Sequence, residues 1–192
     1  FNTYTGTYKG VEITVTSTGI GAPSAAIAME EMYESGMQVA VRMGTVMSMQ
    51  DDMLGHFMIP IAAMRREGTS QTYVDLSYPA VADIELVNVM NETVQQMGKR
   101  YLNGLNCTMD GFYSCMHDSK FSLECGRDMS KTFEEVKKLG VTGIDMESSC
   151  ILTLGRLMGV KTCILTVVTV LENLKETLKG QDRVDAEDLL CR

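Results

Sequence analysis

An arginine at the end of an apolar run is the first feature that could do chemistry, in the segment Arg42-Met43-Gly44-Thr45. A buried arginine is unfavourable unless it is paired with a carboxylate or faces a ligand. Its planar fork of donors suits phosphate or carboxylate, Gly44 permits a close backbone approach, and the Thr45 hydroxyl adds a donor. The residues alone support an anion site and an arginine ion-paired at the rim of a sheet about equally.

Two carboxylates that flank a thioether form the second candidate, Asp145-Met146-Glu147, where a short strand passes into a helix. One carboxylate can accept hydrogen bonds from both hydroxyls of a sugar diol, and a methionine can pack on the sugar face. The alternative is helix capping, in which Asp145 or Glu147 complements the positive end of the helix dipole. Spacing alone favours the capping interpretation.

Two loops add further candidates. Residues 17–24, STGIGAPS, join a strand to a helix, but Ser24 stands where a dinucleotide-binding fingerprint needs its third glycine. This loop therefore predicts a tight turn with close backbone packing, which is compatible with a ligand site. Phe112 follows another strand and could stack on a heterocycle, although an aromatic residue in that place is usually part of the core.

The elements that must position these residues alternate between strand and helix. Period-two alternation and β-branched runs predict strands, and helical spacing followed by glycine predicts helices. The strands are expected at 11–16, 39–41, 101–109, 144–146 and 162–170, and the helices at 23–35, 77–97, 131–139, 147–158 and 182–190. The first two strands and the intervening helix are expected to form a βαβ unit with parallel pairing.

This order predicts a single α/β domain over residues 1–192, an α/β/α arrangement around a central mixed, largely parallel β-sheet. Ligands of such sheets bind beyond the carboxyl ends of the strands. The segments to search for a site are therefore 17–24, 42–49, 109–120 and 145–148.

Composition restricts the possible partners. The chain carries 17 Lys and Arg against 25 Asp and Glu, a formal charge of -8, and its basic residues do not cluster. Such a surface repels nucleic-acid phosphates, and no apolar run approaches the roughly 20 residues of a membrane span. Six cysteines without a C-x-x-C pair, and two distant histidines, predict reduced thiols and no metal site. We therefore expect a cytoplasmic protein with no nucleic-acid or membrane partner.

Together these segments resemble the nucleoside phosphorylase family, most closely its uridine phosphorylase branch. The loop 17–24 is similar to the family's S-T-G-I-G-G-P-S loop, and Arg42-Met43-Gly44-Thr45 is similar to its R-I-G-T phosphate segment. Residues 78–83 resemble a stretch of the bacterial uridine enzymes, residues 110–113 match D-x-F-Y, and residues 145–148 resemble the E-M-E-S sugar signature. The resemblance covers nearly the whole chain and outweighs the residue-by-residue alternatives above.

The resemblance implies a pentosyltransferase, a uridine-phosphorylase-like enzyme of nucleoside catabolism and pyrimidine salvage. Such an enzyme converts a nucleoside, here a pyrimidine one, and inorganic phosphate as co-substrate into a nucleobase and ribose 1-phosphate. No metal or organic cofactor is implied. A homodimer or higher homo-oligomer is implied as well, and the methionine-rich stretch 37–64 is a candidate for the subunit contact.

The same resemblance implies the site residues, motif by motif. Arg42 and Glu147 are the expected catalytic residues, and the expected binding residues are Arg42, Gly44 and Thr45 for phosphate, Thr45, Met146 and Glu147 for ribose, and Phe112, Met116 and Asp118 for the base. These types suit the reaction. Cleavage through an oxocarbenium-like sugar needs an anionic nucleophile held under C1′, a fixed ribose and a stabilised leaving base.

Departures from the family pattern leave two alternatives open. Met116 and Asp118 stand where the uridine enzymes carry the Gln and Arg that read uracil, and Val46 and Met47 replace small residues of the phosphate loop. One alternative is a catalytically weakened paralogue that binds a nucleoside or serves as an assembly subunit, and the other is a purine nucleoside phosphorylase. A family element with a second phosphate-binding arginine would precede Phe1, so we expect the chain to be truncated at its N-terminus.

Overall fold

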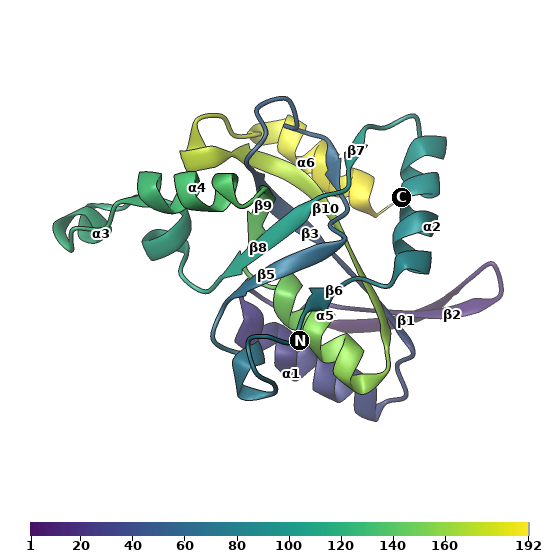
Figure 1. Cartoon of the computed structure of the whole chain (residues 1–192). Coiled ribbons are helices and arrows are strands. Elements are labelled where there is room, and N and C mark those ends of the chain that lie inside the picture. The colour runs from purple at the N-terminus through teal and green to yellow at the C-terminus, as the bar shows by residue number, and fades with distance from the viewer. Residues whose placement is uncertain (192) are drawn as a thin grey trace.

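A computed structural model describes residues 1–191 as an eight-stranded mixed sheet with helices on both faces and a separate hairpin (Figure 1). The hairpin consists of β1 (Thr3–Tyr8) and β2 (Val11–Thr16). The strands of the sheet are β3 (Val39–Ser48), β4 (Phe57–Met58), β5 (Ala62–Arg66), β6 (Ala80–Val81), β7 (Tyr101–Leu102), β8 (Leu105–Met109), β9 (Val141–Asp145) and β10 (Lys161–Leu171). The helices are α1 (Ala22–Glu34), α2 (Ile84–Gln96), α3 (Lys120–Glu124), α4 (Met129–Lys138), α5 (Ser148–Met158) and α6 (Gly180–Leu190), with short turns η1 (Ser70–Thr72), η2 (Phe112–Met116) and η3 (Glu172–Leu174).

The sheet mixes parallel and antiparallel pairs in the order β6-β5-β8-β9-β3-β10-β4-β7. β5, β8 and β9 run parallel to one another, and β3 runs parallel to β10. β3 and β9, however, are antiparallel. The mixed sheet flanked by helices confirms the predicted fold class.

The two ends of this strand order are connected through the chain itself. β4 continues into β5, and β7 continues into β8, after very short connections. The backbone N–H groups of Ile59 and Ile61 donate to the carbonyls of Leu102 and Gly104, each at 3.0 Å, so the two strand pairs form one ladder. The sheet therefore curls round on itself, and an apolar cluster that includes the fully buried Met58 fills its inside.

The expected strand 101–109 is bent into β7 and β8 at Asn103-Gly104. The side-chain amide of Asn103 makes both contacts at the bend. Its Nδ2 donates to the Ile59 carbonyl at 2.9 Å, and it exchanges hydrogen bonds with the side-chain amide of Asn91 in α2. A side chain at position 104 would collide with Thr142 of β9. The bend therefore depends on partners that are distant in the sequence.

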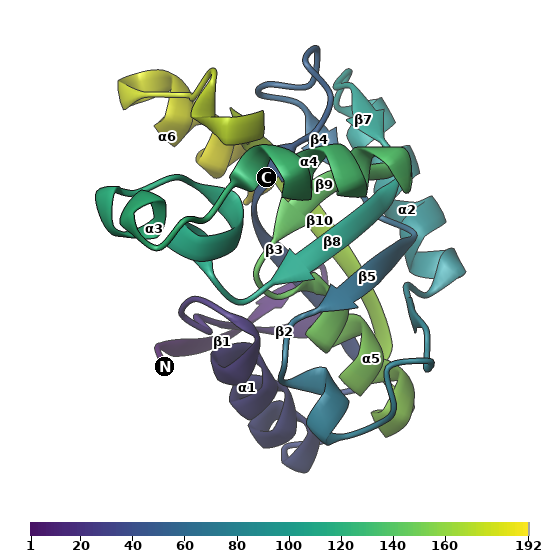
Figure 2. The ribbon, with the colours of Figure 1, turned by 60° about the vertical axis from the view of Figure 1, so that its left-hand side comes forward.

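Helices cover both faces of the sheet (Figure 2). α1 and α5 lie side by side on one face, where Ala25 and Ile151 belong to one core cluster. α2 and α6 contribute Val87 and Leu190 to a cluster on the other face, and α4 places Phe133 in a third cluster against β8 and β9. These layers place the amino end of α5 next to the end of β9.

The predicted βαβ unit is wrong in its first strand. β2 forms as expected, but it pairs antiparallel with β1 and not with β3. Tyr4 lies opposite Val15 and Tyr8 opposite Val11, so one face of the hairpin is apolar, and Val11 and Val15 are 63% and 64% exposed. The alternation that predicted a half-buried strand is present, but the rest of the described chain does not cover its apolar face.

α2 begins later than the Tyr78-Pro79 signal predicted. Asp83 is the residue before the helix, and its carboxylate accepts hydrogen bonds of 3.1 Å from the backbone N–H groups of Glu85 and Leu86. Residues Ala80–Val81 pair instead with β5 as β6. The proline therefore precedes an edge strand, and the aspartate cap decides where the helix starts.

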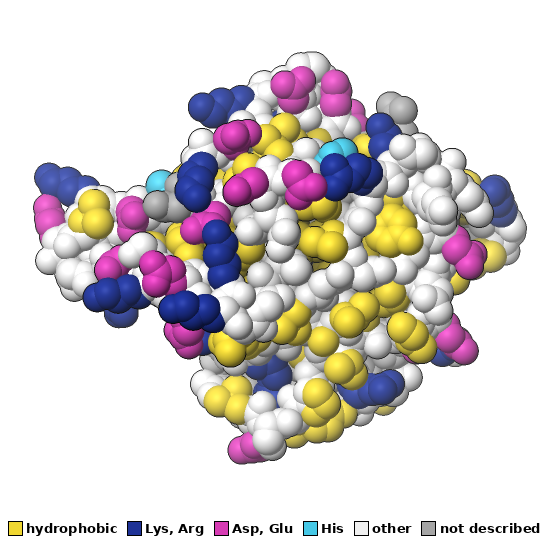
Figure 3. Space-filling view, turned by 45° about the horizontal axis from the view of Figure 1, so that its top comes forward, with side chains coloured by type: hydrophobic (Ala, Val, Ile, Leu, Met, Phe, Trp, Pro, Cys, Tyr) yellow, Lys and Arg dark blue, Asp and Glu magenta, His cyan; other side chains and the backbone are white. Residues whose placement is uncertain are grey.

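The surface and the methionines bear on possible partners. The methionine-rich stretch 37–64 was a candidate for a subunit contact, but four of its methionines are buried: Met47, Met49, Met53 and Met58. Side chains that fill the core in this way are not available to contact another subunit. On the face drawn in Figure 3, Lys and Arg side chains are interspersed with Asp and Glu, without a continuous basic stripe. In residues 1–191, the structure contains no helix with the length and apolarity that a membrane span requires.

Candidate active site

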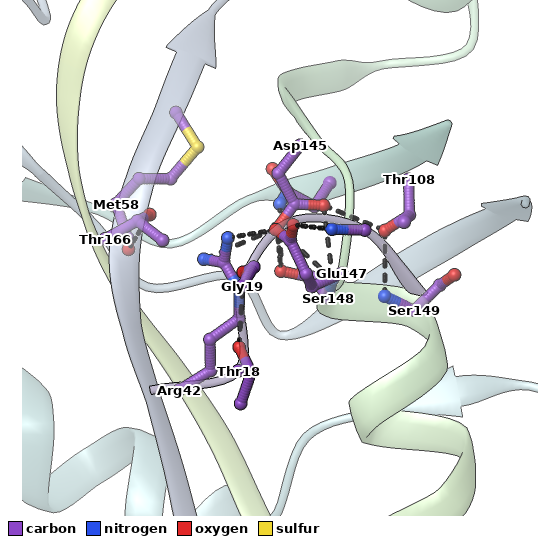
Figure 4. Close-up of polar contacts among 12 residues, drawn as sticks. Thr18, Gly19, Arg42, Met58, Thr108, Asp145, Glu147, Ser148, Ser149 and Thr166 are labelled. Carbon is purple, nitrogen blue, oxygen red and sulfur yellow. Dashed lines mark hydrogen bonds and ion pairs between the residues drawn. The ribbon is translucent and has the colours of Figure 1, made fainter. Parts of the chain in front are cut away.

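The direction of β3 determines which side chains lie near Arg42. β3 and β9 are antiparallel, with Met47 opposite Ile144, so the first half of β3 lies beside the carboxyl end of β9. Arg42 is in that first half, and Glu147 stands just before α5. Figure 4 shows the Arg42 guanidinium directed at the carboxylates of Asp145 and Glu147. Two motifs that lie 105 positions apart in the sequence thus form one cluster.

Glu147 is held between Arg42 and the glycine loop. Its Oε2 accepts a hydrogen bond from Arg42 Nη2, and its Oε1 accepts one of 2.6 Å from the backbone N–H of Gly21. The Arg42 side chain is 12% exposed and that of Glu147 is 9% exposed, so the ion pair is mostly desolvated. Gly21 has a φ of 94°, a conformation that glycine adopts without strain. The loop therefore supplies a backbone donor to the site.

Asp145 lies behind this pair and is anchored by several donors. Thr108 Oγ1 donates to Oδ1 at 2.9 Å, the Ser148 N–H lies 3.2 Å from both carboxylate oxygens, and the Ser148 hydroxyl donates to Oδ2. Arg42 Nη1 lies 3.6 Å from Oδ2 as an ion pair. Burial raises the pKa of the Asp145 carboxyl above its usual range, although Arg42 acts in the opposite direction.

The helix-capping alternative is correct for one of the two carboxylates. Asp145 accepts the backbone N–H of Ser148, the first residue of α5. Glu147 makes no capping hydrogen bond and is left to Arg42 and Gly21. The two acidic residues of the motif therefore have different tasks.

Gly44 makes room for the Arg42 side chain. A Cβ atom at position 44 would lie 3.0 Å from Arg42 Nη1 and 3.2 Å from both Cζ and Nη2. The guanidinium therefore folds back over the glycine, two residues along the same face of β3. This contact explains the arginine and glycine spacing through local packing, before any ligand is considered.

Thr45 and Met146 are not part of this cluster. Side chains alternate along a strand, so Thr45 points to the face opposite that of Arg42 and Gly44. None of the hydrogen bonds within the cluster, over the described residues, involves Thr45. Met146 packs against the core cluster that contains Met47. Their contacts with phosphate and ribose remain predictions.

The proposed base-binding segment follows β8, whose Thr108 pairs with Asp145 of β9. Phe112 is 37% exposed, and its ring meets that of Tyr113 edge-on with centroids 5.0 Å apart. Met116 is buried in the core, whereas Asp118 Oδ1 is buried without a hydrogen-bond partner among the described residues. Phe112 and Asp118 therefore retain groups that a ligand could use.

The sequence missed a buried acid behind the site. Glu67 follows two arginines, a pattern typical of a solvated face, but it is 2% exposed and accepts hydrogen bonds from the backbone and hydroxyl of Ser70 and the hydroxyl of Ser149. Ser149 in turn donates its backbone N–H to Thr108 Oγ1 at 2.8 Å. Hydrogen bonds thus connect Glu67 to Asp145 through α5 and β8. Nothing in the Arg-Arg-Glu pattern around Glu67 distinguishes it from a surface run.

Metal ligands do not gather in the described part of the chain. Over residues 1–191, no group of three or more His, Cys, Asp or Glu side chains is arranged to hold a metal ion. The groups that the cluster offers to a ligand are a guanidinium, a carboxylate and a backbone N–H. These groups suit a phosphate and a sugar diol.

Comparison with known proteins identifies the family, because the model of the phosphorylase superfamily matches residues 1–188. The chain belongs to the phosphorylase superfamily. It is 36% identical over 169 residues to the uridine phosphorylase of Thermococcus kodakarensis, which covers 87% of this chain and 61% of that protein. It is 30% identical over 187 residues to the uridine phosphorylase of Treponema pallidum, which covers 97% of this chain and 71% of that one.

A solved structure agrees with this membership of the phosphorylase superfamily. Uridine phosphorylase from Vibrio fischeri ES114, complexed with 6-hydroxy-1-naphthoic acid, superposes with a TM-score of 0.80 at 31% identity. The match covers 97% of this chain and 71% of that chain. The predicted family and its fold are confirmed, and the chain spans about three fifths to seven tenths of the length of these proteins.

Proposed function

We propose that this protein is a uridine-phosphorylase-like pentosyltransferase that converts a pyrimidine nucleoside and phosphate into a nucleobase and ribose 1-phosphate. The observation that carries the proposal is the contact between Arg42 and Glu147, which brings an anion-binding group and a diol-binding group to one place. Similarity to uridine phosphorylases over most of the chain supports the same activity.

In the proposed reaction, Arg42 holds phosphate and Glu147 accepts hydrogen bonds from the ribose hydroxyls. Phosphate oxygen attacks C1′ as the N-glycosidic bond breaks, and the leaving base takes the bonding electrons. Holding the two reactants in line removes much of the entropic barrier, and the guanidinium neutralises the nucleophile while it is bound. No metal or organic cofactor takes part in this scheme, in which phosphate is the co-substrate.

Phe112 and Asp118 are the proposed base-binding residues. The exposed ring of Phe112 offers a stacking face, and Asp118 Oδ1, which has no hydrogen-bond partner within residues 1–191, is proposed to accept the N–H of a pyrimidine imide. Met116 would contribute only through the shape of the pocket wall, because it is buried. Thr45 and Met146, both partly buried, are proposed to contact phosphate and ribose as the family resemblance implies.

A homodimer or higher homo-oligomer and a cytoplasmic location complete the proposal. The apolar face of the β1–β2 hairpin supports a contact between copies, since exposed apolar faces of this kind favour association. We expect sedimentation of the wild-type protein to give a dimer or larger species. The variant Ile13→Asp should sediment as a smaller species, and an unchanged profile would contradict a contact through the hairpin.

The six free cysteines support the proposed cytoplasmic location, because thiols stay reduced in that compartment.

Phosphate-dependent base release tests the activity. The protein is incubated with uridine, deoxyuridine, inosine and adenosine, each with and without phosphate, and base and ribose 1-phosphate are quantified. We expect release from uridine or deoxyuridine only when phosphate is present. Release of base from none of the four nucleosides would refute the proposal, and preferential release from inosine or adenosine would move it to a purine enzyme.

A further inference from the structure

One guanidinium faces two carboxylates in the candidate active site. Arg42 Nη2 donates to Glu147, and Arg42 Nη1 lies 3.6 Å from Asp145 Oδ2. Arg42 Nη1 is buried and makes no hydrogen bond within the described residues. Of the two terminal nitrogens, Nη2 therefore donates a hydrogen bond to a carboxylate, and Nη1 is attracted to one by charge alone.

The two carboxylates differ in how firmly they are held. Asp145 receives donors from Thr108 and from the backbone and hydroxyl of Ser148, and its side chain is 1% exposed. Glu147 is held only by Arg42 and the Gly21 N–H. Asp145 is thus fixed in the protein and out of reach of a ligand, whereas Glu147 can exchange its partners for ligand groups.

Substrate binding would change the partners of Arg42 in the proposed reaction. Glu147 turns to the ribose hydroxyls, and phosphate takes its place beside Arg42 Nη2. A mostly buried arginine that lost Glu147, with no other carboxylate beside it, would carry an unbalanced charge at considerable cost. Asp145 is the only carboxylate of the cluster that stays in place behind the guanidinium.

We propose that Asp145 is a positioning residue that holds the Arg42 guanidinium in line for phosphate while Glu147 binds the ribose. This role rests on the proposed phosphorylase function and adds to it. The planar guanidinium is fixed along one edge by Asp145, so its opposite edge is presented to the anion. Asp145 touches no ligand and acts through Arg42.

Asp145→Asn tests this role because it keeps the shape of the side chain and removes its charge. We expect the KM for phosphate to rise about tenfold or more and kcat to change less, as for loss of one partner of a buried charge pair. Calorimetric titration with inorganic phosphate should show the same loss of affinity without turnover. Asp145→Glu, which keeps the charge, should restore phosphate affinity to within about threefold of wild type. Asp83→Asn, the same change at the start of α2, is the matched control and should leave both constants unchanged.

A double-mutant cycle with Arg42→Lys separates positioning from a general structural effect. If Asp145 acts through Arg42, the loss in phosphate affinity for the double variant is smaller than the product of the two single losses. A double variant whose loss in phosphate affinity equals the product of the two single losses would overturn the proposal. So would a folded Asp145→Asn variant with unchanged phosphate affinity. If Asp145→Asn does not fold, Thr108→Val removes one anchor of Asp145, and an unchanged phosphate affinity there overturns it equally.

The failure of the proposed function would look different. Wild-type protein would then release no base from any nucleoside, while the calorimetric titration would still report on Asp145 and Arg42. Conversely, a wild-type enzyme that turns over uridine and an Asp145→Asn variant that matches it would leave the function intact and refute the positioning role.

Discussion

Arg42, Glu147 and Asp145 place one positive and two negative charges in a mostly desolvated cluster. Residue types and spacing alone left Arg42 and Glu147 open to structural roles, and the resemblance of their motifs to the nucleoside phosphorylase family is what allowed them to be predicted as site residues. The anchors of Asp145 could not, since Thr108 is 37 positions away and is recognised only through the pairing of β8 with β9. The burial of Glu67 could not be predicted either, because Ser149, which donates to it, is 82 positions away.

Glu147→Gln should reduce the kcat/KM for uridine by about 100-fold or more, the usual effect of removing a charged group that stabilises the transition state. The amide keeps the size of the side chain but loses the carboxylate that accepts two hydroxyls and balances Arg42. Steady-state phosphorolysis at saturating phosphate measures the effect. Glu85→Gln removes a carboxylate from an exposed ion pair with Lys161 and should have no effect. An equal loss in both variants would remove Glu147 from the reaction.

Asp145 should make stability depend on pH in a distinctive direction. Burial raises the pKa of its carboxyl in the folded state, so its contribution is fully present below the unfolded value of about 3.9 and is lost as the pH rises through the folded value. The amide introduced by Asp145→Asn cannot ionise. The stability of this variant relative to wild type should therefore increase as the pH is raised from 4 to 7.

Urea unfolding of both proteins across that pH range measures this difference, and Asp83→Asn controls for the loss of an aspartate. A relative stability of Asp145→Asn that decreases with rising pH would mean that the ionised carboxylate stabilises the free protein. An increase, combined with weaker phosphate binding, would mean that Asp145 is retained for function at the expense of stability.

At the level of elements, the sequence predicted most helices but missed the strands β1, β4, β5 and β6, and it did not specify how the strands pair. Local signals locate β2, β10, α1 and α5 to within one residue, but the strand expected over 39–41 continues to Ser48 as β3, so Arg42 lies within the strand and not at its end. The antiparallel contact between β3 and β9, which brings Arg42 to α5, depends on registers that no local pattern specifies. The same limit explains why β2 was assigned to a parallel unit that does not form.

Gly44→Ala tests how β3 positions the arginine. The added Cβ would lie 3.0 Å from Arg42 Nη1, so the guanidinium must shift by a few tenths of an ångström from its place beside Asp145 and Glu147. We expect the KM for phosphate to rise about tenfold or more, with a smaller change in the KM for the nucleoside, because small displacements of a binding group are costly. Gly68→Ala, where a Cβ meets its neighbours at an ordinary 3.5 Å, should behave as wild type. Equal phosphate constants in the two variants would show that Arg42 does not need the space above Gly44.

At the scale of the whole molecule, the curled sheet connects the core to the site. Gly143 of β9 faces the inside of the curl, where a Cβ would lie against Met58 Sδ and 2.5 Å from Asn106 Oδ1. The Asn106 amide nitrogen lies 3.4 Å from the hydroxyl of Ser148, which holds Asp145. Crowding at this position should therefore act on both stability and the cluster.

Gly143→Ala should lower the free energy of unfolding by about 1–3 kcal/mol, the usual effect of overpacking a filled interior. Chemical denaturation monitored by circular dichroism measures the change, and Gly68→Ala, where a Cβ meets its neighbours at an ordinary 3.5 Å, is the control. Because Asn106 lies against Ser148, we also expect weaker phosphate binding in Gly143→Ala under conditions where it remains folded. A variant as stable as wild type would mean that the interior of the curled sheet can accommodate an added methyl group. Close packing at Gly143 would then not be what fixes α5 beside β9.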